Sequence, residues 1–292
     1  MQDGNLSAPI ISNMKVFEKA NAKINLYLDV SEKREDGFHA VTTFMHQITL
    51  CDDLWIEAQD SEQTEIQLTV KGNDRIPTDG NNLVAKAIQL FLKTVRRTMK
   101  VRVTLVKRIP TMAGLGGGSS DAAAALRGMN QLLGRPLKDE KLEELSAIIG
   151  SDVPFFIRHI SALCSGRGEI LQKITPVMTA YAVVVEGKES SSTREAFAKL
   201  DRQKRPPKMH PDFRYFTYAD AYNIFESVIA QDCPSVDTHL RLLRKHNPLC
   251  TQMSGSGSAV FALFSSLEEA HAAAKSLQFM HSKAYVCQLA QE

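Results

Sequence analysis

PTMAGLGGGSSDAAAAL, residues 110–126, is the stretch that decides the fold of this chain. It follows VRVTLVKRI, in which apolar residues alternate as they do in a half-buried strand. Four glycines then fall within the five positions 114–118, and an alanine run of high helix propensity comes after them. The pattern predicts a strand, a glycine loop and the N-terminus of a helix, in that order.

The glycine loop is a candidate anion site. Glycine allows left-handed backbone dihedrals and close approach of a ligand to the main chain. Free N–H groups and the positive end of the helix dipole would face an anion such as phosphate. Ser119 and Ser120 are expected at the N-cap of the helix. Lys107 and Arg108 could raise the local potential. A solvated strand end and a flexible, well-capped loop are the alternatives that the residues leave open.

The spacing excludes two common phosphate loops. A Walker A loop ends in GK[ST], and no lysine follows the glycines here. GLGGGS also lacks the GxGxxG spacing of dinucleotide-binding proteins, and no clear βαβ unit with a downstream acidic residue accompanies it. The loop therefore indicates a nucleotide-dependent protein outside both classes.

The composition is that of a globular protein with one large or two medium domains. The 292 residues are 43% hydrophobic and 23% charged, and the net charge of +2 is too small to indicate a nucleic-acid or membrane partner by itself. The five cysteines are odd in number and lack CxxC spacing, so we expect neither a disulfide framework nor a zinc site. A reducing compartment, the cytoplasm, fits this pattern. We expect no membrane span and no secretory signal.

The N-terminal part predicts strands. Residues 15–30, KVFEKANAKINLYLDV, are expected to form two strand segments interrupted at residues 20–23. Every second residue from 26 to 30 is apolar, which predicts one apolar face. Residues 34–37 are a turn signal, and residues 46–58 again have the pattern of a strand.

Four residues of these segments are candidates for a site. Lys23 and Asn25 lie two positions apart, so they would share one face of a strand. Taken alone, Lys23 would be an exposed lysine and His39 a histidine on a surface turn, while Phe38 would be a core residue. The residue types by themselves leave these roles open.

Helices and a second α/β half complete the chain. Asn82 precedes LVAKAIQLFLKTV, whose apolar stripe predicts a packing helix capped by that asparagine. The helix after the glycine loop should span about 119–133 and stop at Gly134, and an amphipathic helix should follow over 138–149. The second half is expected to have strands at 181–185 and 283–289, helices at 193–200 and 267–277, and a small-residue loop at 254–258 that leads into a strand.

GSDVPFF, residues 150–156, places an aspartate beside an apolar wall. Asp152 stands between a helix-ending glycine and Pro154. Aspartate often caps a turn of this kind. The same placement suits a carboxylate that is held rigidly for catalysis, and the residues alone do not separate the two roles.

Four segments resemble, in their order and spacing, the motifs of the GHMP kinases, the family of galacto-, homoserine, mevalonate and phosphomevalonate kinases. They are AKINLYLDV with REDGFHAVTT, GLGGGSSDAA, GSDVPFF and TQMSGSGSAVFALF, and they span about residues 20–263. Each loop alone is weakly specific. A further segment, SGRGEIL at 165–171, resembles a stretch near the junction of the family's two domains.

The resemblance implies an α+β fold, the two-domain GHMP kinase fold. Residues 14–158 would form an ATP-binding domain, an α/β sandwich like a domain of a small-subunit ribosomal protein. Residues 159–290 would form a ferredoxin-like C-terminal domain. The active site would lie in the cleft between the two.

The resemblance also implies roles for particular residues. Asp152 and Lys23 match the catalytic aspartate and its lysine. Residues that match contacts to the acceptor substrate are Asn25, Phe38, His39 and Phe197, the last with core packing as its open alternative. Many family members have Tyr where this chain has Phe38, so the stacking face is kept and the hydroxyl is lost. Residues that match the nucleotide loop are Met112, Ala113, Gly114, Leu115, Gly116, Gly117, Gly118, Ser119, Ser120, Asp121 and Ala122.

The extended form GLGGGSSDAA resembles most the branch of the family whose substrate is a cytidine diphosphate derivative of methylerythritol. It implies ATP-dependent phosphorylation of the 2-hydroxyl, with Mg²⁺ entering with the nucleotide and no metal ligand assigned to a side chain. We expect a monomer or homodimer that acts on a small molecule, without a nucleic-acid or membrane partner. A homoserine or phosphomevalonate kinase and an RNA-binding protein on the same scaffold are the alternatives. The near-neutral charge argues against the last.

Overall fold

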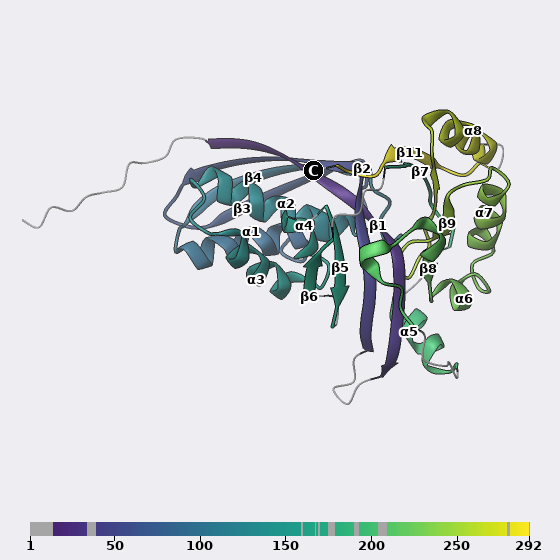
Figure 1. Ribbon diagram of the computed structural model, residues 1–292. Helices are drawn as coiled ribbons and strands as arrows, with labels where there is room; N and C mark the ends of the chain where they lie inside the picture. Colours follow the sequence, from purple (N-terminus) through teal and green to yellow (C-terminus); the bar gives the residue numbers. More distant parts are fainter. Residues whose placement is uncertain are drawn as a thin grey trace, which may run out of the picture.

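The computed structural model describes residues 14–33, 39–158, 160–166, 168, 170–174, 179–189, 193–203, 209–278 and 281–291. Phe38, expected at the acceptor substrate, and Arg167 of the SGRGEIL segment lie outside the described residues. Two sheets organise the described chain, and each has helices on one face (Figure 1).

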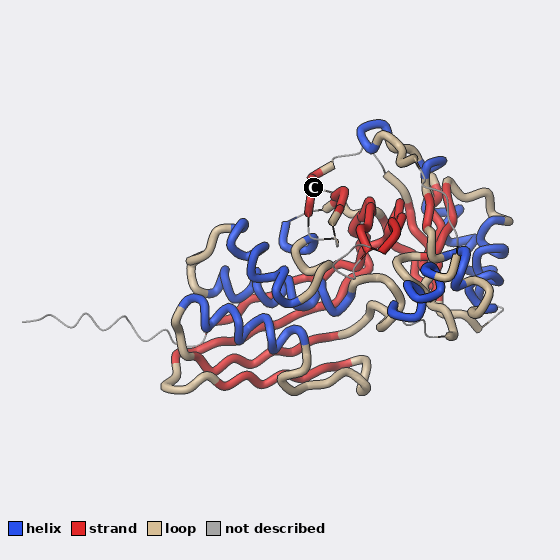
Figure 2. The backbone as a smooth tube through the Cα atoms, turned by 90° about the horizontal axis from the view of Figure 1, so that it is seen from below, coloured by secondary structure: helices blue, strands red, loops and turns tan. Residues whose placement is uncertain are grey.

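The larger sheet has seven strands and forms the first lobe together with helices α1–α4. Its strands follow the order β3–β4–β2–β1–β8, and β5 pairs with β2 and with β6. The strands are β1 (Met14–Lys33), β2 (His39–Asp60), β3 (Glu65–Lys71), β4 (Met99–Val106), β5 (Ser161–Ser165), β6 (Ile170–Lys173) and β8 (Tyr222–Asn223). The helices are α1 (Leu83–Val95), α2 (Gly117–Leu132), α3 (Asp139–Ile149) and α4 (Phe155–Arg158), and they gather on one side of the sheet (Figure 2).

The smaller sheet has four strands in the order β11–β7–β10–β9 and forms the second lobe with helices α5–α8. The strands are β7 (Tyr181–Val185), β9 (Cys250–Met253), β10 (Val260–Phe264) and β11 (Ala284–Gln288). The helices are α5 (Thr193–Asp201), α6 (Glu226–Ile229), α7 (Pro234–Arg244) and α8 (Leu267–Gln278), and the short 3₁₀ turns are η1 (Phe213–Tyr215) and η2 (Tyr218–Asp220). The division of the chain at residues 158 and 159 stays a prediction; β5 and β6, which follow it, pair within the first sheet.

The long strand β1 differs from its prediction. It is one strand of 20 residues, where two segments had been expected. Its register with β2 shifts at three places, and one of them, between Asn21 and Ala22, falls at the expected interruption. A β-bulge lets a strand bend without ending, which is why the polar interruption does not stop it. The prediction of a single apolar face is also wrong. Residues 22–30 are buried on both faces, because the second lobe packs on the side opposite the helices.

The two predicted helix caps have different outcomes. Asn82 caps α1 as predicted, since its Oδ1 accepts a hydrogen bond from the backbone N–H of Val84 at 2.8 Å. The N-cap of α2 is Gly116, with φ 70°, so the prediction for Ser119 and Ser120 is wrong. Both serines lie inside the first turn. The glycine extends the helix toward the loop because it adopts the left-handed dihedrals that a serine disfavours.

Three buried clusters hold the molecule together. One lies between the large sheet and α1–α4, and another lies between the small sheet and α5–α8. The third joins the lobes and includes Ile24, Phe44, Val184 and Phe261, which come from β1, β2, β7 and β10. Because this junction has an apolar core of its own, the lobes are fixed relative to each other where the loops of both meet.

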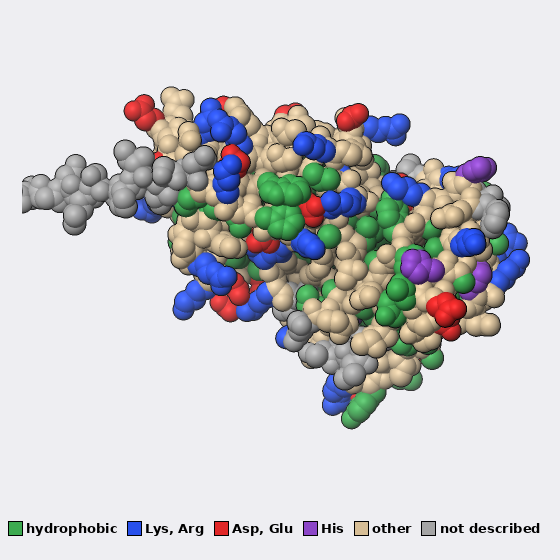
Figure 3. Space-filling view, turned by 90° about the horizontal axis from the view of Figure 1, so that it is seen from above, with side chains coloured by type: hydrophobic (Ala, Val, Ile, Leu, Met, Phe, Trp, Pro, Cys, Tyr) green, Lys and Arg blue, Asp and Glu red, His purple; other side chains and the backbone are tan. Residues whose placement is uncertain are grey.

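Outside the part that the second lobe covers, the face of the large sheet that carries no helix is polar, with one apolar feature. Phe17 and Trp55 are 46% and 42% exposed, and their rings lie 5.0 Å apart across the β1–β2 pair. Viewed from that side, Lys, Arg, Asp and Glu side chains surround a small hydrophobic group (Figure 3). All five cysteines are free, as expected. Within the described residues, no helix is long and apolar enough to cross a membrane.

The glycine loop of the first lobe touches the small-residue loop of the second. Ser254 Oγ donates to the carbonyl of Gly114 at 2.9 Å, and the N–H of Ala259 donates to the carbonyl of Ala113 at 3.0 Å. A Cβ atom on Gly114 would lie only 2.0 Å from the carbonyl oxygen of Ser254. The main chains of the two lobes can therefore meet only because residue 114 is glycine.

Gly114→Ala should force these loops apart and destabilise the protein by about 2–4 kcal/mol, because overpacking adds to the strain of its φ of 79°. Gly134→Ala is the matched control. Its φ is 75°, yet nothing lies within 4 Å of an added Cβ, so it carries the strain without the clash. Denaturant unfolding of both variants measures the difference. Equal losses of free energy would contradict the proposed contact.

Candidate active site

A cavity of about 400 Å³ opens at the start of α2, between the glycine loop and the turn before α1. Met112 through Ser119, together with Asp121, line it, so nine of the eleven residues predicted to hold the nucleotide face this space. Ser120 and Ala122 do not; both are buried behind it, because they lie on the side of α2 that packs on the first lobe.

The loop has the backbone expected of an anion cradle. Met112, Gly114 and Gly116 all have positive φ, and α2 then begins directly at Gly117. The first N–H groups of a helix have no partner within the helix, so those at the start of α2 are available to a ligand at the cavity. The N–H of Lys23 donates to the carbonyl of Leu115 at 3.0 Å, which ties the loop to β1.

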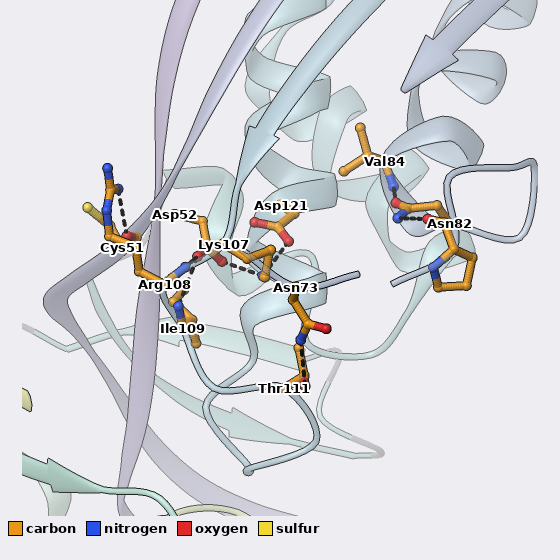
Figure 4. A network of polar contacts seen from close by, with 11 residues as sticks. Cys51, Asp52, Asn73, Asn82, Val84, Lys107, Arg108, Ile109, Thr111 and Asp121 are labelled. Carbon is orange, nitrogen blue, oxygen red and sulfur yellow. Dashed lines mark hydrogen bonds and ion pairs between the residues drawn. The ribbon is translucent and has the colours of Figure 1, made fainter. Parts of the chain in front are cut away.

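Apart from Lys107, a candidate for raising the local potential, the sequence did not indicate the other wall of the cavity. It consists of Ile76, Pro77, Asn81, Asn82, Leu83, Lys107, Pro110 and Thr111. Asn82 Nδ2 donates to the carbonyl of Pro77 at 2.7 Å, and Asn73 Nδ2 reaches Thr111 Oγ1 at 3.4 Å (Figure 4). Asn82 was recognised only as a helix cap, and α1 was expected to pack without chemistry. Two asparagines before that helix were the available signal, since they place polar amide side chains at its N-terminus.

Lys107 is buried, which excludes its interpretation as a solvated strand end. Its Nζ donates to Asp52 and, at 2.7 Å, to Oδ2 of Asp121 (Figure 4). Oδ1 of Asp52 accepts from the N–H groups of Arg108 and Ile109 at 2.5 and 2.9 Å. The end of β4 is therefore anchored to β2 just below the glycine loop.

Lys23 and Asn25 share one face of β1, as predicted, and both are buried. Lys23 Nζ donates to Asn25 Oδ1 at 2.5 Å, and Asn25 Nδ2 donates to Thr43 Oγ1 at 2.8 Å. Burial lowers the pKa of Lys23, and the charge of Asp152 partly offsets this effect. Asp152 is half-buried between α3 and α4. The fold thus brings together a lysine and an aspartate that are far apart in the sequence.

Gly116 links this pair to the cradle. A Cβ atom there would lie 2.8 Å from the ring of Phe156 and 3.0 Å from Cγ of Lys23. Across the junction, a Cβ atom on Gly255 would lie 3.4 Å from Lys23 Nζ. Lys23 is therefore held between the glycine loops of the two lobes.

The predicted acceptor residues His39 and Phe197 lie together, although 158 positions separate them in the sequence. Their ring centroids are 5.0 Å apart, and Phe197 also packs edge-on against Phe225 at 5.0 Å. His39 Nε2 pairs with Oδ1 of Asp201 at 2.7 Å, which joins the start of β2 to the end of α5. Asp201 was not predicted.

Two family models match the chain in the order of its lobes. The N-terminal domain of the GHMP kinases matches residues 82–159, and the C-terminal domain of the GHMP kinases matches residues 215–283. The first match contains the glycine loop, and the second contains the small-residue loop that packs against it. The chain belongs to the GHMP kinase family, and its α+β two-domain fold is the one expected from the sequence.

Within this family the chain is most like 4-diphosphocytidyl-2-C-methyl-D-erythritol kinase. The enzyme of that name from Alkaliphilus oremlandii is 34% identical over 94% of this chain and 96% of its own length. The one from Syntrophomonas wolfei is 36% identical over 93% and 97%. A crystal structure of 4-(cytidine 5'-diphospho)-2C-methyl-D-erythritol kinase covers 95% of this chain with a TM-score of 0.81 and 28% identity, and all of that chain is matched.

More distant structures share the fold alone. Homoserine kinase from Cytophaga hutchinsonii has a TM-score of 0.66 and 19% identity, covering 96% of this chain and 95% of its own. The alternatives of a homoserine kinase, a phosphomevalonate kinase or an RNA-binding protein therefore have less support than the cytidine diphosphate branch.

Gly116→Ala should push Lys23 and Phe156 away from the cradle and lower both turnover and ATP affinity, each by roughly tenfold or more, since small displacements at a reacting centre are costly. Gly118→Ala is the comparison variant. An added Cβ there would meet only Leu83, at an ordinary 3.7 Å, so its effect should be much smaller. Steady-state kinetics with both variants would test this, and equal losses would contradict the arrangement.

Proposed function

We propose that this chain is an ATP-dependent kinase that phosphorylates the 2-hydroxyl of 4-diphosphocytidyl-2-C-methyl-D-erythritol, a step of the non-mevalonate route to isoprenoid precursors. The relatives that share most of its length carry that name, and the four segments that resemble GHMP kinase motifs support it. The observation that carries the proposal is Lys23, which lies against the glycine loop of the cavity and is influenced by the charge of Asp152.

Phosphoryl transfer depends on positioning and on neutralising charge more than on covalent chemistry. The cradle formed by residues 112–119 would hold the triphosphate through backbone N–H groups at the start of α2. The nucleoside would extend along the wall that contains Pro77, Asn82 and Leu83. The transferred phosphate would then lie at the end of the cradle where Gly116 touches Lys23.

The acceptor hydroxyl would meet Asp152 at this point. Asp152 would accept its proton, and Lys23 would hold the carboxylate and the hydroxyl in line. Asn25 fixes the ammonium of Lys23 by its hydrogen bond, and Thr43 in turn fixes Asn25. A positioned charge in a buried setting costs no reorganisation during the reaction, which is the usual source of its catalytic effect.

The cytidine end of the substrate would lie against His39 and Phe197, with Phe38 as a further expected contact. The pair between His39 and Asp201 would hold the imidazole ring in place. An aromatic surface binds a nucleobase by stacking, and the edge of a histidine ring can add a hydrogen bond.

We expect Mg²⁺ to enter with ATP, bound to phosphate oxygens whose charge it would neutralise. The part of the chain that the structure describes contains no group of three His, Cys, Asp or Glu side chains that could hold a metal ion, so the phosphates themselves would supply most of its ligands. A cytoplasmic enzyme, monomeric or homodimeric, remains our expectation.

Asp152→Asn keeps the shape of the side chain and removes its charge. Turnover should fall by roughly 10²–10⁴, the range of general acid–base groups, while ATP affinity changes little. Lys23→Ala should be similarly severe. The double variant should lose much less than the product of the two single effects, because the residues act as one unit. Product formation from ATP and the cytidine diphosphate substrate measures this. A folded Asp152→Asn protein with near-normal turnover would refute the assignment.

Phe197→Leu should raise the KM for the cytidine diphosphate substrate by roughly tenfold and leave that for ATP unchanged, since base stacking is worth about 1–3 kcal/mol. The nearby Phe225→Leu serves as a control. Its ring packs on Phe197, so the variant removes a neighbour of Phe197 and keeps the Phe197–His39 contact. If only Phe225→Leu raised the KM for the cytidine diphosphate substrate, Phe197 would be a core residue and not a substrate contact.

A further inference from the structure

Three buried charged groups lie below the phosphate cradle: Asp52, Lys107 and Asp121 (Figure 4). They come from the middle of β2, the loop after β4 and the first turns of α2. Lys107 donates to both carboxylates, and its Nζ lies 3.3 Å from the position of a Cβ on Gly117. Lys107 and Asp121 also line the cavity. The cluster is therefore next to the space where phosphates would bind.

The two carboxylates are held unequally. Asp52 accepts hydrogen bonds from Lys107 and from two backbone N–H groups, those of Arg108 and Ile109. Among the described residues, Asp121 accepts a hydrogen bond only from Lys107, through Oδ2, and its Oδ1 is buried without a hydrogen-bond partner there. A buried carboxylate oxygen without a donor is costly when ionised, and it is satisfied more easily as a hydroxyl.

The charges of the cluster do not cancel. Two carboxylates and one ammonium leave a net charge of −1 when all three are ionised. Burial raises the pKa of Asp121 to about 7; the ammonium of Lys107 opposes this rise and the charge of Asp52 adds to it. Burial would lower the pKa of Lys107, but Asp121 and Asp52 outweigh burial and raise it, so the ammonium stays charged. Within the described chain, Lys107 and Asp52 are the titratable groups that interact with Asp121.

We propose that Asp52 and Asp121 are positioning residues for the nucleotide: they hold the ammonium of Lys107 under the first turn of α2, and Asp121 takes up a proton from solvent when a triphosphate binds. Asp52 is the fixed anchor, because three hydrogen-bond donors hold its carboxylate in place. Asp121 is the adjustable member, because its free oxygen can accept the proton. This inference rests on the proposed use of ATP and adds a proton linkage to it.

The direction of the linkage follows from charge. An anionic triphosphate beside Asp121 disfavours its ionised form and so favours protonation, which turns the cluster from a net −1 to neutral. Binding is therefore strongest where Asp121 is already protonated, below its pKa, and weakens as the pH rises above it. The ammonium of Lys107 then keeps Asp52 as its only ionised partner in the cluster, and the phosphates meet a neutral cluster in place of an anionic one.

Isothermal titration of ATP into the wild-type protein, in two buffers of different ionisation enthalpy at about pH 8, counts the protons that bind. ATP is itself fully ionised there, since phosphate groups titrate near pH 6. Uptake of roughly half a proton or more is expected, and ATP affinity should fall by about fivefold to tenfold between about pH 7 and pH 8.5. This count needs no variant. Zero uptake would overturn the proposal.

Asp121→Asn imitates the protonated state, and it should abolish proton uptake and the steep fall in affinity, so that it binds ATP more tightly than the wild type at about pH 8.5. Asp53→Asn is the matched control. It removes the same charge one position from Asp52, but its partner Arg108 is 47% exposed and does not line the cavity, so proton uptake should be unchanged.

The outcomes separate this inference from the proposed function. Weaker binding by Asp121→Asn at every pH, with a wild-type pH profile and proton count, would show a purely structural role or a Mg²⁺ contact and overturn the linkage alone. Titrations with and without Mg²⁺ distinguish those two. A wild-type protein that binds no ATP at any pH would overturn both the linkage and the proposed kinase.

Discussion

The close contact of two main chains, at Gly114 and Ser254, is the constraint on which the rest of the site depends. The contact joins loops from different lobes with almost no side chain between them. Lys23 lies beside it, under Gly116 and opposite Gly255. Side chains at these glycines would push the glycine loop, the loop of the second lobe and Lys23 apart. The lack of side chains therefore keeps the site compact, and the same contact holds the lobes together.

Local sequence patterns were sufficient for several elements and for the order of strand, glycine loop and helix. The alternation before the glycines, the alanine run after them and the asparagine before α1 each act within a few residues, and the structure agrees with them in β4, α2 and the α1 cap. Both predicted catalytic residues and the pair of His39 and Phe197 came from motifs and not from periodicity. The structure brings Lys23 near Asp152 and His39 against Phe197, and the roles of all four remain predictions.

What the sequence could not indicate depends on long-range packing. The alternation of apolar residues within 22–30 predicted a strand with only one buried face, because such alternation reflects packing on one side of a sheet. The second lobe, which covers the other face, is built from residues beyond 180. Lys107 looked solvated because its partner Asp52 lies 55 positions earlier. The serine caps failed for a local reason instead, since the glycine in front of them takes the cap position by its left-handed dihedrals.

The cost of burying charge explains why the site depends on long-range packing as well as on local sequence patterns. Taking an ion from water costs several kcal/mol, so a fold keeps such groups only where partners repay most of that cost. Lys23 has an amide and a carboxylate nearby, whereas Asp121 has one donor for two oxygens. The deficit at Asp121 lies against the cradle, where a triphosphate would add further negative charge. A neutral side chain of the same shape would remove that cost in the free protein. A carboxylate at this position makes physical sense if its protonation changes when the cradle is filled.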